Sequence, residues 1–220
     1  MSAERRVKYQ DLSAEQAVAL LFGVTKKELD GVALQCWSAF MSVGPLKPKG
    51  FGGTSAWAYG TEALRELFIP KGWVPVDPNN QPRVVSPDGK HAIAVISGDS
   101  DTGNPHREPQ TRNKRGSQTL RSVTYNSRQG QLFPVSRSVG ATVDLDCAEG
   151  QSLWILLFHV DIGAQEVRYE LSRPVNFGDN DKVDGWEPRF IMPALSFQAR
   201  GSGRAPDDGV DFDIPVMPRL

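Results

Sequence analysis

The first third of the chain carries apolar residues at helical spacing. Ser13 and Gln16 fit a capping box, and the apolar residues behind them recur every three to four positions. Thr25 and Glu28 fit a second capping box. The stripe behind it consists of Leu29, Val32, Ala33, Cys36 and Phe40. These patterns predict two amphipathic helices, the second ending at the Gly-Pro pair at 44–45.

Residues 47–55, KPKGFGGTS, are rich in glycine and carry two lysines. We expect a loop here, with Thr54 or Ser55 able to cap a third helix. That helix would place Trp57, Gly60, Leu64 and Leu67 on one face and stop at Pro70. Residues 75–87 contain several turn signals and are expected to be a connector.

From His91 onward, the apolar pattern is continuous or has period two, which is typical of strands. The expected strands are 92–96, 120–126, 139–147, 152–161, 166–172 and 189–197. The 152–161 segment is apolar through its middle and should be central, with 166–172 as its hairpin partner. The 189–197 segment contains a proline and should lie at an edge.

Helices that precede strands, without alternation between the two, favour an α+β fold. We expect a helical N-terminal layer packed on a largely antiparallel β-sheet. The whole chain, 1–220, is interpreted as a single domain. Its helical part covers about 1–72, its β-rich part about 83–198, and an extended tail 199–220.

Composition agrees with a globular protein, because 39% of the residues are hydrophobic and 23% are charged. The sequence contains no apolar run long enough for a transmembrane helix, and its N-terminus does not resemble a signal peptide. Cys36 and Cys147 are expected to be buried thiols rather than a disulfide framework. We therefore expect a cytoplasmic protein.

The net charge of −1 gives no global attraction for a charged partner, but the charge is unevenly distributed. Residues 97–119 form a long polar loop whose second half is basic. The candidate ligand-binding residues there are Arg107, Arg112, Lys114 and Arg115. Arginine makes bidentate contacts with phosphate, so this half of the loop could bind nucleic acid or another phosphate-bearing ligand. The alternative is a solvated surface loop.

The 47–55 segment is the second candidate for phosphate binding. Its glycines would let a ligand approach the backbone, and the helix start that follows would favour an anion. Lys47 and Lys49 would add positive charge, and Phe51 could stack on a base. The segment lacks the P-loop pattern, and it could equally be a plain connection between helices.

Asp99 and Asp101 begin the long loop and are two residues apart at the end of an expected strand. In an extended chain their carboxylates would point to the same side and could hold Mg²⁺ or Mn²⁺. His106 or Lys114 could then support a metal-dependent nuclease or phosphoesterase reaction. The competing interpretation is a turn rich in Asp, Ser and Gly.

Other possible sites receive less support from the sequence. His159 and Asp161, with Glu166 and Arg168 beyond a short turn, are expected to form cross-strand pairs. Zinc-binding pairs, the nucleophile elbow and the dinucleotide fingerprint are all absent, so no catalytic residue is assigned and no cofactor is certain.

Three hypotheses of function remain. The leading one is a bacterial cytoplasmic protein that binds nucleic acid or another phosphate-bearing ligand through residues 97–119, aided by 47–55. The second is the metal-dependent nuclease or phosphoesterase that uses Asp99 and Asp101. The third is a protein-interaction subunit of a larger complex, with no membrane partner. Both phosphate hypotheses require the two loops to converge in space.

Overall fold

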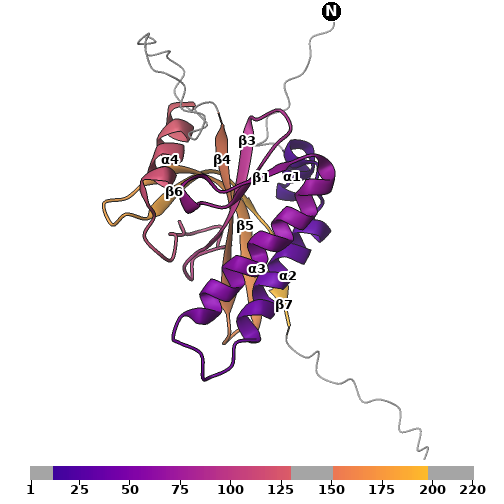
Figure 1. Cartoon of the computed structure of the whole chain (residues 1–220), viewed down its shortest axis with the longest axis vertical. Coiled ribbons are helices and arrows are strands. Elements are labelled where there is room, and N and C mark those ends of the chain that lie inside the picture. The colour runs from indigo at the N-terminus through magenta and orange to yellow at the C-terminus, as the bar shows by residue number, and fades with distance from the viewer. Residues whose placement is uncertain (1–11, 130–150, 198–220) are drawn as a thin grey trace, which may run out of the picture.

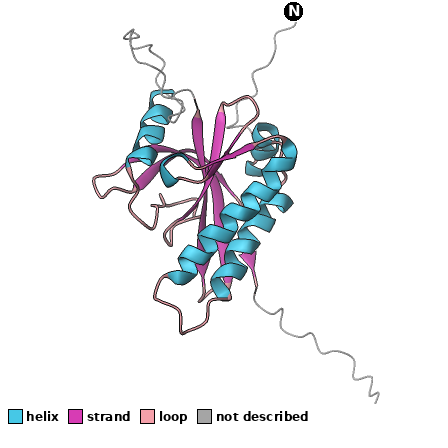
Figure 2. Ribbon diagram, viewed as in Figure 1, coloured by secondary structure: helices cyan, strands magenta, loops and turns pink. Residues whose placement is uncertain are grey.

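The computed structural model describes residues 12–129 and 151–197 of the chain. Within these ranges it contains four α-helices and a seven-stranded, mostly antiparallel sheet, which confirms the α+β prediction. Figure 2 shows the sheet in the middle of the molecule with helices around it. The predicted strand 139–147 and the tail 199–220 lie outside the described residues.

The N-terminal helices are α1 (Ala14–Phe22), α2 (Lys26–Met41) and α3 (Phe51–Phe68). Both predicted capping boxes are present: the Ser13 hydroxyl accepts from the Gln16 N–H, and the Thr25 hydroxyl accepts from the Glu28 N–H. The helix α3 begins earlier than predicted, because Gly50 and not Thr54 or Ser55 is its N-cap. Glycine at position 52 suits α2–α3 packing, since a Cβ there would lie 3.2 Å from the Phe40 ring.

The strands are β1 (Val74–Val76), β2 (Arg83–Val85), β3 (His91–Ser97), β4 (Ser152–Asp161), β5 (Glu166–Phe177), β6 (Val183–Ile191) and β7 (Leu195–Ser196). The order across the sheet is β1-β2-β3-β4-β5-β6, and β7 also pairs with β5. Only the β3–β4 pair is parallel among these described strands. The parallel pair therefore lies at the centre of the sheet, where Figure 1 labels β3 and β4 next to each other.

Several predicted strands are confirmed and some are corrected. Strands β3 and β4 and the β4–β5 hairpin match the prediction. The expected connector 75–87 instead contains β1 and β2, whose three-residue lengths are too short to show a period. The predicted proline-containing edge strand 189–197 is confirmed as an edge, but the strand begins at Val183 and is divided into β6 and β7.

The predicted strand 120–126 is wrong, because these residues belong to α4 (Ser117–Gln129). Gln118, Thr119, Val123 and Asn126 are buried, which is a helical spacing. Three of these four side chains are polar, so the buried face is not visible as an apolar stripe. The Asn126 side chain donates to the carbonyls of Leu153 and Pro174 and accepts from the Leu153 N–H.

The core has two parts, one on each face of the sheet. On one face, α1, α2 and α3 pack over residues such as Ile93, Val95 and Trp154. On the other face, Val123 of α4 packs against Leu153 and neighbouring strand residues. Figure 1 shows α2 and α3 side by side along the sheet, with α4 separate from them. Cys36 is buried between α2 and α3, as predicted.

Candidate functional site

The loop of residues 98–116, called the basic loop below, leaves the end of β3 and runs to α4. Backbone hydrogen bonds join the later part of the loop to the end of β3. Gly98 forms a β-bridge with Thr111, and the Arg112 N–H donates to the Ser97 carbonyl at 2.8 Å. The Asp99 carboxylate accepts from the Asp101 and Gln110 N–H groups and so closes the acidic turn. These contacts position the arginines that follow.

The edge strand β6 holds the outer side of the basic loop. The Trp186 indole N–H donates to the Pro109 carbonyl at 2.7 Å. The Arg189 guanidinium donates to the Arg107 carbonyl at 2.7 Å and to the Asn104 carbonyl at 3.1 Å. The same guanidinium forms an ion pair with the buried carboxylate of Glu170. The basic loop is therefore fastened to the sheet at several points along its length.

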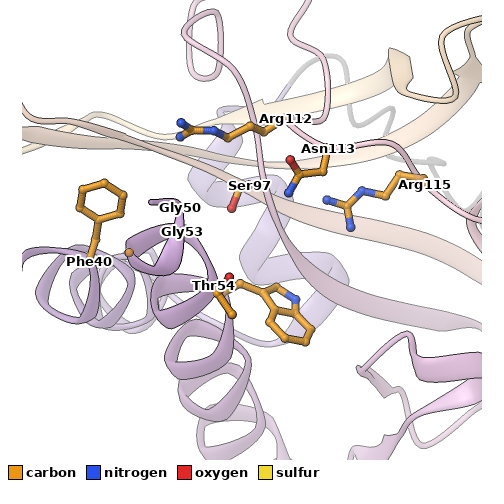
Figure 3. A pocket seen from close by; sticks show the side chains of 10 residues that line it. Phe40, Gly50, Gly53, Thr54, Ser97, Arg112, Asn113 and Arg115 are labelled. Atoms are coloured by element: carbon orange, nitrogen blue, oxygen red, sulfur yellow. The ribbon is translucent and has the colours of Figure 1, made fainter. Parts of the chain in front are cut away.

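A pocket of about 360 Å³ lies between the basic loop and the start of α3. It is lined by Phe40, Gly50, Gly52, Gly53, Thr54, Trp57, Ser97, Arg112, Asn113 and Arg115. Figure 3 shows Arg112, Asn113 and Arg115 on one side of it, and Gly50, Gly53 and Thr54 on the other. The two segments singled out in the sequence thus converge, which both phosphate hypotheses require.

Arg112 and Arg115 bring positive charge to the pocket. Neither forms an ion pair with any carboxylate of residues 12–129 and 151–197. Arg115 is partly buried, and its Nε atom is buried without a hydrogen-bond partner in these ranges. Burial lowers the pKa of Arg115, but a guanidinium stays charged at neutral pH. Arg115 therefore brings a cation without a carboxylate partner in these ranges to the pocket.

The N-terminus of α3 brings one further donor, the Gly52 N–H, to the same pocket. Gly50 adopts φ +84°, a conformation that favours glycine, and no side chain caps the helix. The Gly52 N–H finds no acceptor within the described part of the chain. A Cβ at Gly53 would meet no atom within 4 Å, so a ligand has room to approach the helix there, while the Gly53 N–H itself donates to the Gly50 carbonyl at 3.0 Å. The helix dipole adds a partial positive charge at this end.

The other basic residues predicted for ligand binding lie outside the pocket lining. Lys114 pairs with Asp181 at 3.1 Å, and Arg107 lies 3.5 Å from Asp101. The exposed Lys47 lies over the Phe51 ring, with its Nζ 5.4 Å from the ring centre. Lys49 is exposed on the turn before α3. Of the predicted residues, the structure brings only Arg112 and Arg115 together in the pocket.

The acidic turn shows no set of metal ligands. Both Asp99 oxygens accept backbone N–H groups, and Asp101 faces Arg107. Across residues 12–129 and 151–197, no three His, Cys, Asp or Glu side chains gather in a geometry suited to a metal ion. His106 is exposed and its N–H donates to Asn104. The metal site at Asp99 and Asp101 stays a prediction.

The β4–β5 hairpin holds the predicted cross-strand pairs. His159 is opposite Arg168, and Asp161 is opposite Glu166. The Arg168 guanidinium lies 3.3 Å from both carboxylates and donates to the Ser100 carbonyl at 2.8 Å. Burial lowers the pKa of His159, which keeps its imidazole neutral near pH 7. These polar residues hold the hairpin against the acidic turn.

Comparison with protein families, with curated proteins and with solved structures finds no match for this chain. The site is therefore interpreted from its own chemistry. Among the helices that the structure describes, none has both the length and the apolar character to cross a membrane.

Sequence reasoning missed the aromatic part of the pocket lining. Phe40 and Trp57 were assigned to apolar helix faces, yet Trp57 is 36% exposed and borders the arginines. Ser97, Thr54 and Asn113 lie within the two segments that the sequence proposes for ligand binding, 97–119 and 47–55. The available signal was Trp57 itself, which lies one helical turn beyond the Gly-Gly pair at 52–53.

Proposed function

We propose that the protein binds a phosphate-bearing ligand, nucleic acid included, in the pocket between α3 and the basic loop. The observation that carries the proposal is the convergence of Arg112 and Arg115 with the uncapped N-terminus of α3. Phosphate accepts bonds from guanidinium groups and from helix N-terminal amides, and both donor types line this pocket.

The charge balance supports an anion rather than an uncharged ligand. Elsewhere on the basic loop, Arg107 and Lys114 each have a carboxylate partner within 4 Å. Arg112 and Arg115 have none within the described residues, and they are the two that line the pocket. An anion would supply the missing countercharge.

The proposal is tested by calorimetric titration of inorganic phosphate, pyrophosphate and a short single-stranded oligonucleotide, each over a range of salt. Arg115→Ala is expected to weaken binding at least about tenfold, since a charge-assisted bond contributes ~1.5–3 kcal/mol. Lys114→Ala is the matched control, because it removes the same charge one residue away on an exposed, paired side chain.

Equal losses in Arg115→Ala and Lys114→Ala would mean diffuse attraction to the basic loop and would overturn a pocket site. Absence of binding by all three ligands at low salt would overturn the proposal as a whole.

A further inference from the structure

The charged pocket also has an aromatic wall. Trp57 is 36% exposed, whereas the other four tryptophans of the chain, all within the described residues, are at most 8% exposed. Phe40, partly buried, lines the pocket as well and packs against Gly52. A ligand of this pocket therefore meets cationic donors and a ring face together.

Trp57 stands at a defined distance from the anion-binding end of α3. It follows Gly53 by four residues, so the two share one face of the helix and are separated by a rise of about 6 Å. A ligand that spans this rise can place an anionic group at the helix N-terminus and a planar group against Trp57. A nucleotide has this arrangement, because a pentose connects its phosphate to its base.

The size of the pocket restricts the ligand. Small-molecule pockets commonly measure ~300–1,000 Å³, and this one measures about 360 Å³. The pocket is therefore large enough for one nucleotide and too small for a duplex. Ser97 and Asn113 line it with groups that both donate and accept hydrogen bonds.

We infer that the pocket binds a single nucleoside phosphate, with the phosphate between Arg115 and the α3 N-terminus and the base against Trp57. The nucleotide is either free or one unit of a single strand, and its chemistry is the same in both cases. This inference rests on the proposed function and adds the class of ligand. Stacking against an indole tolerates every base, so little preference among bases is expected.

The test measures affinities by calorimetric titration, which applies to every variant, and in the wild type also follows Trp57 fluorescence, excited at the red edge of indole absorption so that the nucleotide absorbs little. AMP, UMP, ribose 5-phosphate and a single-stranded oligonucleotide are titrated into the full chain. AMP and UMP should quench the exposed Trp57 and bind about tenfold more tightly than ribose 5-phosphate, which lacks the base. In Trp57→Leu this advantage should disappear while ribose 5-phosphate binds as before.

Trp57→Phe keeps a ring and should retain most of the advantage, and its thermal unfolding midpoint controls for folding. If AMP and UMP do not bind, whereas the oligonucleotide binds and loses affinity in Trp57→Leu, the bound nucleotide is one unit of a single strand. If ribose 5-phosphate binds as tightly as AMP, the base does not contribute and the inference is overturned, while phosphate binding stands. If no phosphate compound binds, the proposed function fails as well.

Discussion

The carboxylate of Glu170 and the guanidinium of Arg189 lie 2.7 Å apart in the interior, and Glu170 has no exposed surface. Arg189 uses its remaining donors on two carbonyls of the basic loop. The pair thus connects strand β5 to the segment that carries the pocket arginines. Its integrity decides how firmly the basic loop is held.

Replacing Arg189 with methionine should lower the free energy of unfolding by about 3–5 kcal/mol, because a buried carboxylate is left unpaired. Urea unfolding measures this loss. The double variant Arg189→Met with Glu170→Leu should lose less, since no charge stays buried. A single variant that costs under about 1 kcal/mol would contradict the role assigned to the pair.

Stability should depend on pH through Glu170. Burial, with smaller contributions from Glu108 and Asp99, raises the pKa of Glu170 to about 7 against the opposing effect of Arg189. Because the pKa is higher in the folded state, the folded chain binds more protons between about pH 4.5 and pH 7. The stabilisation that this proton gives the folded state is complete at pH values below this range and is lost as the pH rises through it.

The free energy of unfolding should therefore fall as pH rises across this range, by at most about 1.4 kcal/mol per pH unit from this group. Glu170→Gln should flatten this part of the profile in urea unfolding. The assignment is contradicted if the wild type and Glu170→Gln show the same slope.

Two adjacent glycines should respond differently to alanine. A Cβ at Gly53 meets no atom within 4 Å, so Gly53→Ala should raise the free energy of unfolding by about 0.5–1 kcal/mol. A Cβ at Gly52 lies 3.2 Å from the Phe40 ring, so Gly52→Ala should gain less or lose stability. Thermal unfolding of the two variants, compared in parallel, tests the start of α3 at Gly50.

Asn126 should be the residue that fixes α4 on the sheet. It is fully buried. Its side chain accepts a hydrogen bond from the Leu153 N–H and donates to the carbonyls of Leu153 and Pro174. Asn126→Ala leaves these groups unsatisfied and should cost about 2–4 kcal/mol in urea unfolding. Asn113→Ala, at an exposed position, is the matched control and should change stability by less than about 0.5 kcal/mol.

The features that sequence predicts well here are local. The capping boxes at Ser13 and Thr25 depend on partners three residues away, and both are present. The continuous apolar run of β4 correctly indicates a central strand buried on both faces. The helix α4 was mistaken for a strand because Gln118 and Asn126 occupy its buried face, so hydrophobicity does not mark its period.

The pocket depends on segments that are far apart in the chain. Arg112 and Arg115 are recognisable from the charge of the basic loop, whereas their position opposite Gly53 and Thr54 is set by α3 packing on the sheet. Local patterns also cannot distinguish a basic residue that forms an ion pair from one that does not. Lys114 is an example, because its partner Asp181 lies on a turn far away in the sequence. Tertiary contacts therefore decide which of the predicted basic residues face the pocket.

The central claim is that a phosphate group binds between α3 and the basic loop. Its most direct test is a nitrogen–proton correlation spectrum recorded while pyrophosphate is titrated into the labelled chain. The account predicts the largest shifts at the Gly52 amide, whose N–H has no acceptor among the described residues, and at the Arg115 Nε–H, which reports on its guanidinium. Shifts confined to the acidic turn at Asp99 and Asp101, or no shifts at saturating pyrophosphate, would contradict it.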